Sequence, residues 1–184
     1  SVKGKIIRQD KNSIQVDVGL QTPFTYFLEE IKQILPDRPH HEKTKGTSRN
    51  HQADQLEKKA VELIDENKMD EGMALMKQAV VLDSSPMRHM NYGSILFGNG
   101  VEDYKSKNQE QALKTLSEAQ QELRAAIEGF NPKKEGIFLA QAYFLLGEIY
   151  LNAYSDRIRA KEYYQKAVFY YDNQSAKAAL EKLQ

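Results

Sequence analysis

The side chains of this sequence that could carry out chemistry are four histidines and many carboxylates, and its 184 residues include no cysteine. Without cysteine the chain forms no disulfide, no thiolate nucleophile and no zinc site of the cysteine type. His40, His41 and His51 fall in a polar stretch with two prolines and one glycine, which would not hold metal ligands in a fixed geometry. His89 stands alone at a predicted helix start, where a surface or groove residue is more typical than a catalyst. We therefore predict no metal site.

Sequence motifs of the common enzyme classes are absent as well. The chain has no phosphate-binding loop ending in Gly-Lys-Ser/Thr, no His-Glu-x-x-His and no Gly-x-Ser-x-Gly. Carboxylates on helix surfaces are usually solvated. The tyrosine pairs at 163–164 and 170–171 have helical spacing, which favours packing over a cofactor box. The sequence predicts a protein that is not an enzyme, with no catalytic residue and no cofactor.

The charge balance narrows the kinds of partner. Lys plus Arg and Asp plus Glu both count 26, so the formal net charge is zero. Such a chain has no excess positive charge for nucleic acid or for an anionic membrane. No apolar run approaches the roughly 20 residues that span a bilayer. We predict a protein or peptide partner, no nucleic acid and no transmembrane segment.

Residues 1–35 are predicted to form a small β-rich segment. Apolar and polar residues alternate over residues 14–18, which is the period of a half-buried strand. The run at residues 4–8 precedes it across turn residues 10–12, so the two predict a hairpin. Alternation over residues 24–28 predicts a third strand.

The rest of the chain divides into a linker and a helical region. Residues 36–52 are polar and lack apolar periodicity, which predicts a flexible linker. Over residues 53–184 apolar side chains recur at spacings of three and four, the period of a helix. Asp70 is predicted to cap the second helix, and a serine before Pro86 the third. The predicted breaks between helices lie at residues 66–68, 83–86, 98–108, 129–132 and 153–156, and a short last helix begins near Ser175.

These helices come in pairs with a period in the mid-thirties. The clearest unit reads Tyr143-x-x-Leu146-Gly147-x-x-Tyr150, then Ala160-x-x-x-Tyr164-x-x-Ala167. This pattern resembles the tetratricopeptide repeat (TPR), in which small residues such as Gly147 and Ala160 stand where the two helices cross. Units at residues 56–79 and 92–119 match less closely; the middle one carries an insertion around residues 98–108, and the third has one extra residue in its turn.

The resemblance covers roughly residues 53–174 and implies a mainly α fold, a TPR-like α-α superhelix or solenoid of about three helix pairs plus a capping helix. A helical bundle without repeats is the alternative, and the joint match of spacing and residue size argues against it. The N-terminal segment resembles an Sm-like or SH3-like β-barrel segment of some bacterial envelope proteins. The likeness rests on Gly4-Lys5-Ile6-Ile7, on residues 10–16 and on Glu30-Ile31-x-x-Ile34. The usual first strand would lie before Ser1, and an RNA-binding S1 barrel could open with a similar hairpin. The likeness favours the bacterial periplasm or envelope, with the cytoplasm as the alternative.

TPR proteins bind a peptide along a concave surface lined by the first helix of each pair. For this chain the resemblance implies a partner-binding groove lined by Met87, Met90, Asn91, Ser94, Phe97, Gln141, Phe144, Glu148, Leu151 and Asn152. Burial of these residues under the N-terminal segment or the long helix is the alternative. Family members that grip a terminal carboxylate use Lys, Arg and Asn on this surface. The matching places here hold Glu57, Val61, Met90, Ser94, Phe144 and Glu148, which argues against a carboxylate clamp.

The leading hypothesis is therefore an adaptor, a protein-protein interaction scaffold that binds a partner segment in this groove. The alternative is a structural or assembly component that self-associates as a homo-oligomer or supports a bacterial envelope complex.

Overall fold

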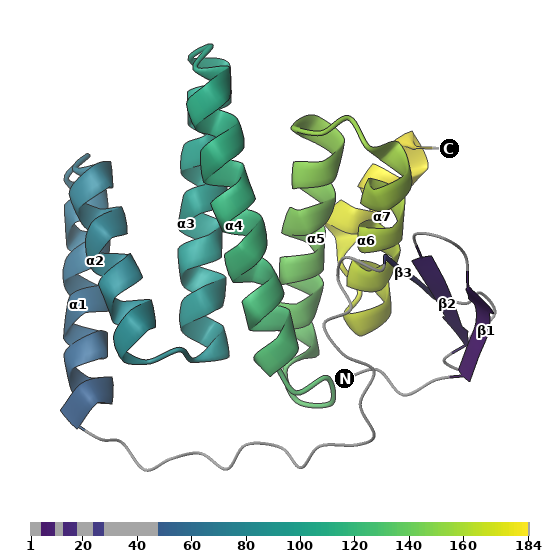
Figure 1. Ribbon diagram of the computed structural model, residues 1–184, viewed down its shortest axis with the longest axis horizontal. Helices are drawn as coiled ribbons and strands as arrows, with labels where there is room; N and C mark the ends of the chain where they lie inside the picture. Colours follow the sequence, from purple (N-terminus) through teal and green to yellow (C-terminus); the bar gives the residue numbers. More distant parts are fainter. Residues whose placement is uncertain (1–4, 10–12, 18–23, 28–47, 184) are drawn as a thin grey trace. The chain divides into compact units, whose positions relative to one another are not determined.

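The computed structural model describes residues 5–9, 13–17, 24–27 and 48–183. The chain divides into two units, residues 1–44 and residues 45–184 (Figure 1). In the first unit, strands β1 (Lys5–Gln9), β2 (Ser13–Asp17) and β3 (Phe24–Phe27) form an antiparallel sheet in the order β1-β2-β3, with a register shift between Ile6 and Arg8. The linker prediction over residues 36–47 and the Glu30–Ile34 part of the barrel likeness lie outside the described residues.

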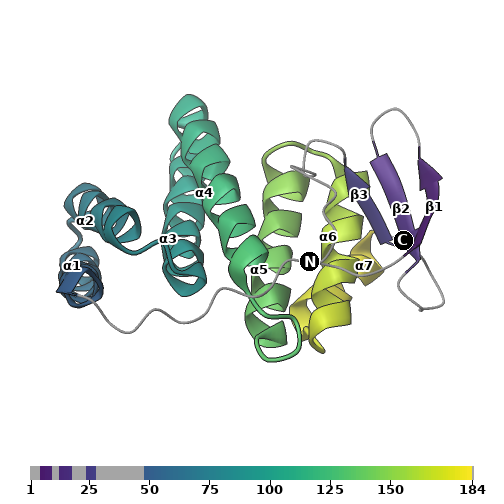
Figure 2. The same cartoon turned by 60° about the horizontal axis from the view of Figure 1, so that its bottom comes forward.

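The described part of the second unit is helical. Antiparallel pairs follow one another in chain order, and each helix makes its most extensive contacts within its pair, while the last helix packs on α6 (Figures 1 and 2). The pairs are α1 (Ser48–Asp65) with α2 (Met69–Leu82), α3 (Pro86–Lys105) with α4 (Gln109–Gly129), and α5 (Gly136–Asn152) with α6 (Arg157–Tyr170), followed by α7 (Gln174–Lys182). No helix among the described residues is long and apolar enough to cross a membrane.

Each turn within a pair contains one residue with a left-handed backbone: Asn67, Lys107 and Ser155, with φ of 60°, 65° and 54°. A left-handed residue after a helix lets the next N–H groups bond to the last free carbonyls. In the first turn the N–H of Lys68 donates to the Leu63 carbonyl at 2.9 Å. In the third turn the N–H of Asp156 donates to the Tyr150 carbonyl, also at 2.9 Å, and closes a loop that is one residue longer. The extra turn residue predicted for the third unit is therefore present.

The largest departure from prediction is the middle pair. Residues 98–108 were expected to form a loop after a helix stop at Gly98-Asn99-Gly100, but α3 continues through them to Lys105, and only 106–108 form the turn. The reason is packing against α4. A Cβ built on Gly100 would lie 2.7 Å from the Leu116 side chain, so glycine permits close approach there. Burial of that leucine offsets the cost of about 1 kcal/mol for a glycine in a helix.

Three helix starts are also corrected or confirmed. Helix α1 begins at Ser48, before the predicted start at residue 53, and Lys68 rather than Asp70 occupies the cap position of α2. Asp70 lies in the first turn, where a carboxylate interacts favourably with the helix dipole. The predicted serine cap of α3 is confirmed, since Ser85 Oγ accepts from the Arg88 N–H at 3.4 Å and Pro86 follows it.

Candidate functional site

The ten residues predicted to line a groove lie on α3 and α5, the first helices of the second and third pairs. Met90 is a core residue with 3% of its surface exposed, so it is not accessible to a partner here. Gln141 and Asn152 are exposed, and the others are half-buried. We call the accessible surface of these helices, together with Glu57 of α1, the first-helix face. It consists of Glu57, Met87, Asn91, Ser94, Phe97, Gln141, Phe144, Glu148, Leu151 and Asn152.

Polar contacts join α1 to α3 beside this face. The Asn91 amide donates to the Glu57 carboxylate at 2.6 Å. The Arg88 guanidinium is 6% exposed and is shared by Asp54, Glu57 and Asp83. Its Nε lies 3.1 Å from Glu57 Oε2 as an ion pair without hydrogen-bond geometry. A buried charge is tolerated only when it is paired, so this arginine ties α1 to the start of α3. The sequence did not predict that Arg88 would be buried and paired. The one local signal for its burial is that it lies beside buried apolar positions of α3.

On α5 a single tyrosine of α6 supports two residues of the face. The rings of Phe144 and Tyr164 lie 5.9 Å apart between centroids. The Tyr164 hydroxyl donates to Glu148 Oε1 at 2.7 Å, and the Asn152 amide donates to Glu148 Oε2 at 3.2 Å. Burial, followed by the hydrogen bond to Glu148, raises the pKa of Tyr164. A side chain at Gly147 would overlap the Tyr164 ring, so this glycine lets the tyrosine reach Glu148.

A second polar network joins α2, α3 and α4. Lys77 Nζ lies 2.7 Å from Glu118 Oε1, and the Tyr92 hydroxyl donates to the same oxygen at 3.1 Å. The hydrogen bond from Lys77 lowers the pKa of Glu118. Burial, assisted by the charge of Glu118, raises the pKa of Tyr92. The negative charge of Glu118 is therefore balanced by Lys77 of the same chain.

One helical turn away from this network, a serine of the turn between α2 and α3 contacts a histidine of α3, which in turn contacts a glutamate of α4. His89 Nε2 lies 2.6 Å from Ser84 Oγ, and His89 Nδ1 lies 2.6 Å from Glu122 Oε2. Hydrolases use this order of contacts to activate a serine. Here the trio joins the turn between α2 and α3 to α4. Glu122 could not be predicted as a member of it, because it lies 33 residues from His89 along the chain. Catalysis would also require donors placed for an oxyanion.

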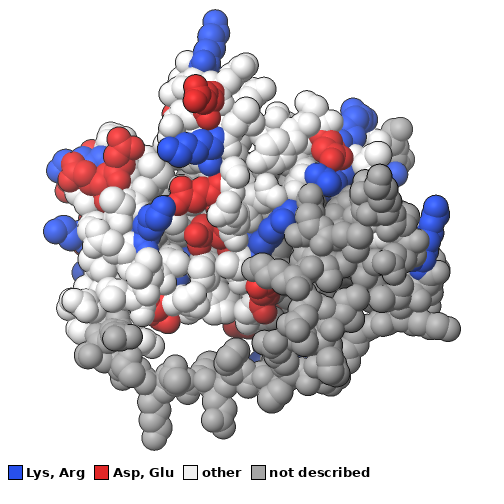
Figure 3. Space-filling model, in the orientation of Figure 1, with Lys and Arg blue, Asp and Glu red and all other residues white. Residues whose placement is uncertain are grey.

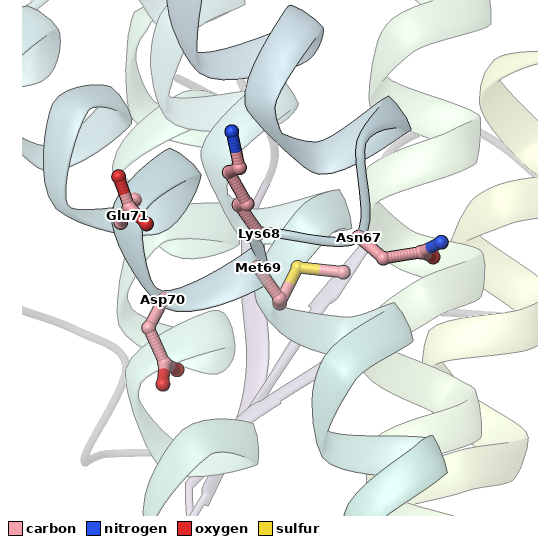
Figure 4. Close-up of a pocket in the computed structure, with 5 residues that line it drawn as sticks. All are labelled: Asn67, Lys68, Met69, Asp70 and Glu71. Atoms are coloured by element: carbon pink, nitrogen blue, oxygen red, sulfur yellow. The ribbon is translucent and has the colours of Figure 1, made fainter.

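Two surface depressions lie elsewhere. The first is lined by residues 67–71 at the turn between α1 and α2, and Figure 4 shows their side chains pointing away from one another, whereas a binding site needs converging groups. The second lies on the outer surface of α2 and is mostly apolar; it is lined by Ala74, Lys77, Gln78, Val81 and Leu82. Neither includes a residue of the first-helix face.

Two other kinds of site, a metal site and a basic nucleic-acid surface, were considered for the described part of the chain. Within it, no three His, Asp or Glu side chains gather as metal ligands. On the face shown in Figure 3, basic and acidic side chains of the described residues are interleaved over the helices, and they form no extended basic patch there. Nucleic-acid binding surfaces have such a patch.

Comparison with known proteins identifies the fold. The chain is similar to the first TPR domain of the human RPAP3 protein, with a TM-score of 0.53 and 20% sequence identity over 73% of this chain and 91% of that one. No protein-family model and no curated protein sequence matches the chain. The helical part thus has a TPR-like fold.

Proposed function

We propose that the chain is a protein-interaction scaffold and that its first-helix face binds an extended segment of a partner protein. The observation that carries the proposal is the composition of this face. Half-buried apolar side chains, Phe97, Phe144 and Leu151, alternate with amide and carboxylate groups that remain accessible. Apolar groups supply affinity when they are covered, and the polar groups can bond to the backbone of an extended chain.

A peptide selection tests this proposal without knowledge of the natural partner. The full chain is immobilised and a phage-displayed library of random nonapeptides is selected on it; enriched peptides are then synthesised with a fluorophore and titrated by anisotropy. The blocked variant Gln141→Trp/Asn152→Trp places two bulky neutral side chains at exposed positions of the face. Gln121→Trp, at an exposed position of α4, is the matched control.

We expect the blocked variant to bind the enriched peptides at least about tenfold more weakly, a change of about 1.4 kcal/mol, and Gln121→Trp to bind them like the wild type. Circular dichroism confirms that both variants are folded. Equal binding by the blocked variant and the wild type would place the binding surface elsewhere and refute the proposal.

Self-association is the second candidate function, because two large apolar side chains are strongly exposed away from this face. Val81 on α2 is 79% exposed and Ile158 on α6 is 74% exposed. Val81 also lies beside Ala74 and Leu82 in the mostly apolar depression on α2, and contiguous apolar surface of this kind marks contacts between protein chains. Sedimentation equilibrium of the wild type and of Val81→Glu and Ile158→Glu separates the candidates: an oligomer that either substitution dissociates supports assembly, and a monomer at all concentrations contradicts it.

A further inference from the structure

The charges on and beside the first-helix face are unbalanced. On the α1 side, Asp54, Glu57 and Asp83 surround the single guanidinium of Arg88. Three negative charges therefore share one positive charge, and that positive charge is buried. The Asp54 side chain remains 67% exposed and the Glu57 side chain 23% exposed, so both can still meet a partner.

On the α5 side, Glu148 is a half-buried carboxylate that has no ion-pair partner among the described residues. Its side-chain donors among the described residues are the hydroxyl of Tyr164 and the amide of Asn152, which are both neutral. These donors hold the carboxylate in place on the face. Glu118 on α4 shows the contrast, because Lys77 lies 2.7 Å from it. A half-buried carboxylate interacts more strongly with an opposite charge than an exposed one does, since water screens it less.

Between the two acidic ends lies α3, which contributes Asn91, Ser94 and the half-buried ring of Phe97. Packed helices lie about 10 Å apart, so two steps from α1 to α5 span roughly 20 Å. An extended chain covers this distance in about six residues at roughly 3.3 Å per residue. The acidic groups and the apolar centre can therefore be met at once by one short segment.

We propose that the segment bound by the first-helix face is basic, with a Lys or Arg near each end of a stretch of about six residues and apolar side chains between them. One cation pairs with Asp54 and Glu57 and the other with Glu148. An acidic segment or a chain-terminal carboxylate would meet like charge at both ends. This inference rests on the proposed function and specifies the chemistry of the partner.

The same random nonapeptide library tests the charge separately from the face. It is selected in parallel on the wild type, on Glu57→Gln/Glu148→Gln and on the blocked variant Gln141→Trp/Asn152→Trp. Glu110→Gln, at an exposed position at the start of α4, is the matched charge control. The enriched peptides are titrated against the folded variants at two salt concentrations.

We expect peptides enriched on the wild type to carry two or more Lys or Arg residues, and their affinity to fall as salt rises. Glu57→Gln/Glu148→Gln should weaken binding at least about tenfold, and Glu110→Gln should leave it unchanged. Enriched peptides that are neutral or acidic, and that the blocked variant fails to bind, would refute the basic partner while the proposed function stands. Peptides that bind the blocked variant as well as the wild type, or no enrichment on the wild type over the blocked variant, would refute both.

Discussion

The α3–α4 and α5–α6 pairs share one packing contact but differ in the side chain opposite it. Gly93 faces Leu123 in the middle pair, and Gly147 faces the ring of Tyr164 in the last pair. Both pairs thus have a glycine on the first helix at this contact, whereas the type of the residue that faces it on the second helix differs. In the last pair that choice shapes the surface, because the tyrosine both covers Gly147 and orients Glu148 on the first-helix face.

Each of the two pairs also contains a hydrogen bond from a tyrosine to a glutamate, but the surroundings of the glutamate differ. Tyr92 donates to Glu118 in the middle pair, and Tyr164 donates to Glu148 in the last pair. Glu118 also pairs with Lys77, while the donors that the described residues provide to Glu148 are the neutral side chains of Tyr164 and Asn152. The tyrosine lies on the first helix of the middle pair and on the second helix of the last pair, so the glutamate that it holds lies on α4 in one case and on the first-helix face in the other.

The largest effect is expected from filling the two glycine positions. Gly147→Ala should lower the free energy of unfolding by about 2 kcal/mol, because a rigid ring occupies the space of the new Cβ. Gly93→Ala should lower it by only about 1 kcal/mol, because the Leu123 side chain is less rigid than a ring and alanine favours the helix, while the Leu123 backbone nitrogen lies 3.2 Å from the new Cβ. Urea unfolding followed by circular dichroism measures both, and equal losses would show that the opposing side chain does not matter.

Removal of the Tyr164 hydroxyl should have a somewhat smaller effect that depends on pH. Tyr164→Phe loses a hydrogen bond to a carboxylate, which costs about 1.5 kcal/mol at neutral pH. Burial and the bond to Glu148 raise the pKa of Tyr164 in the folded chain. Its contribution is therefore complete below the unfolded-state pKa of about 10 and is lost as pH rises above that value.

The free energy of unfolding of the wild type should consequently fall toward that of Tyr164→Phe above about pH 10. Urea unfolding at a series of pH values measures this convergence. Tyr92→Phe tests the same pH dependence in the middle pair, where burial also raises the pKa of Tyr92. A gap between wild type and Tyr164→Phe that widens with pH would contradict the assignment.

The glycines of α3 should give opposite, smaller effects if the helix continues through them. A Cβ on Gly98 would meet nothing within 4 Å, whereas one on Gly100 would meet Leu116. Gly98→Ala should therefore stabilise the chain by about 0.5–1 kcal/mol, and Gly100→Ala should destabilise it by about 1 kcal/mol. Thermal unfolding compares the two, and a loss for Gly98→Ala would mean that this segment is not helical.

The smallest effect is expected from the serine trio of the middle pair, which has no counterpart described for the last pair. Ser84→Ala should lower the free energy of unfolding by about 1 kcal/mol or less, since it removes one hydrogen bond at an exposed residue. A fluorophosphonate probe should leave Ser84 unlabelled. Labelling that His89→Ala abolishes would instead make Ser84, His89 and Glu122 a hydrolytic site.

Much of the helical part was predictable because its signals are local. The break at residues 66–68, the serine cap before Pro86 and the longer third turn follow from turn and cap chemistry within a few residues. The match around Gly147 follows from residue size at fixed spacing. Each of these depends on neighbours within one helix pair, which the sequence places close together.

The sequence by itself determined the helix pairs, the turns of the first and third pairs and the small residues at the helix crossings. Only the tertiary structure decided that α3 continues through Gly98 and Gly100 to Lys105, that Met90 is buried, and that Arg88 is shared by three carboxylates. The physical reason is that these outcomes depend on partners far along the chain, such as Asp54 at 34 residues from Arg88. Local periodicity fixes which side of a helix is apolar, but packing fixes which charges are neutralised and which remain for a partner.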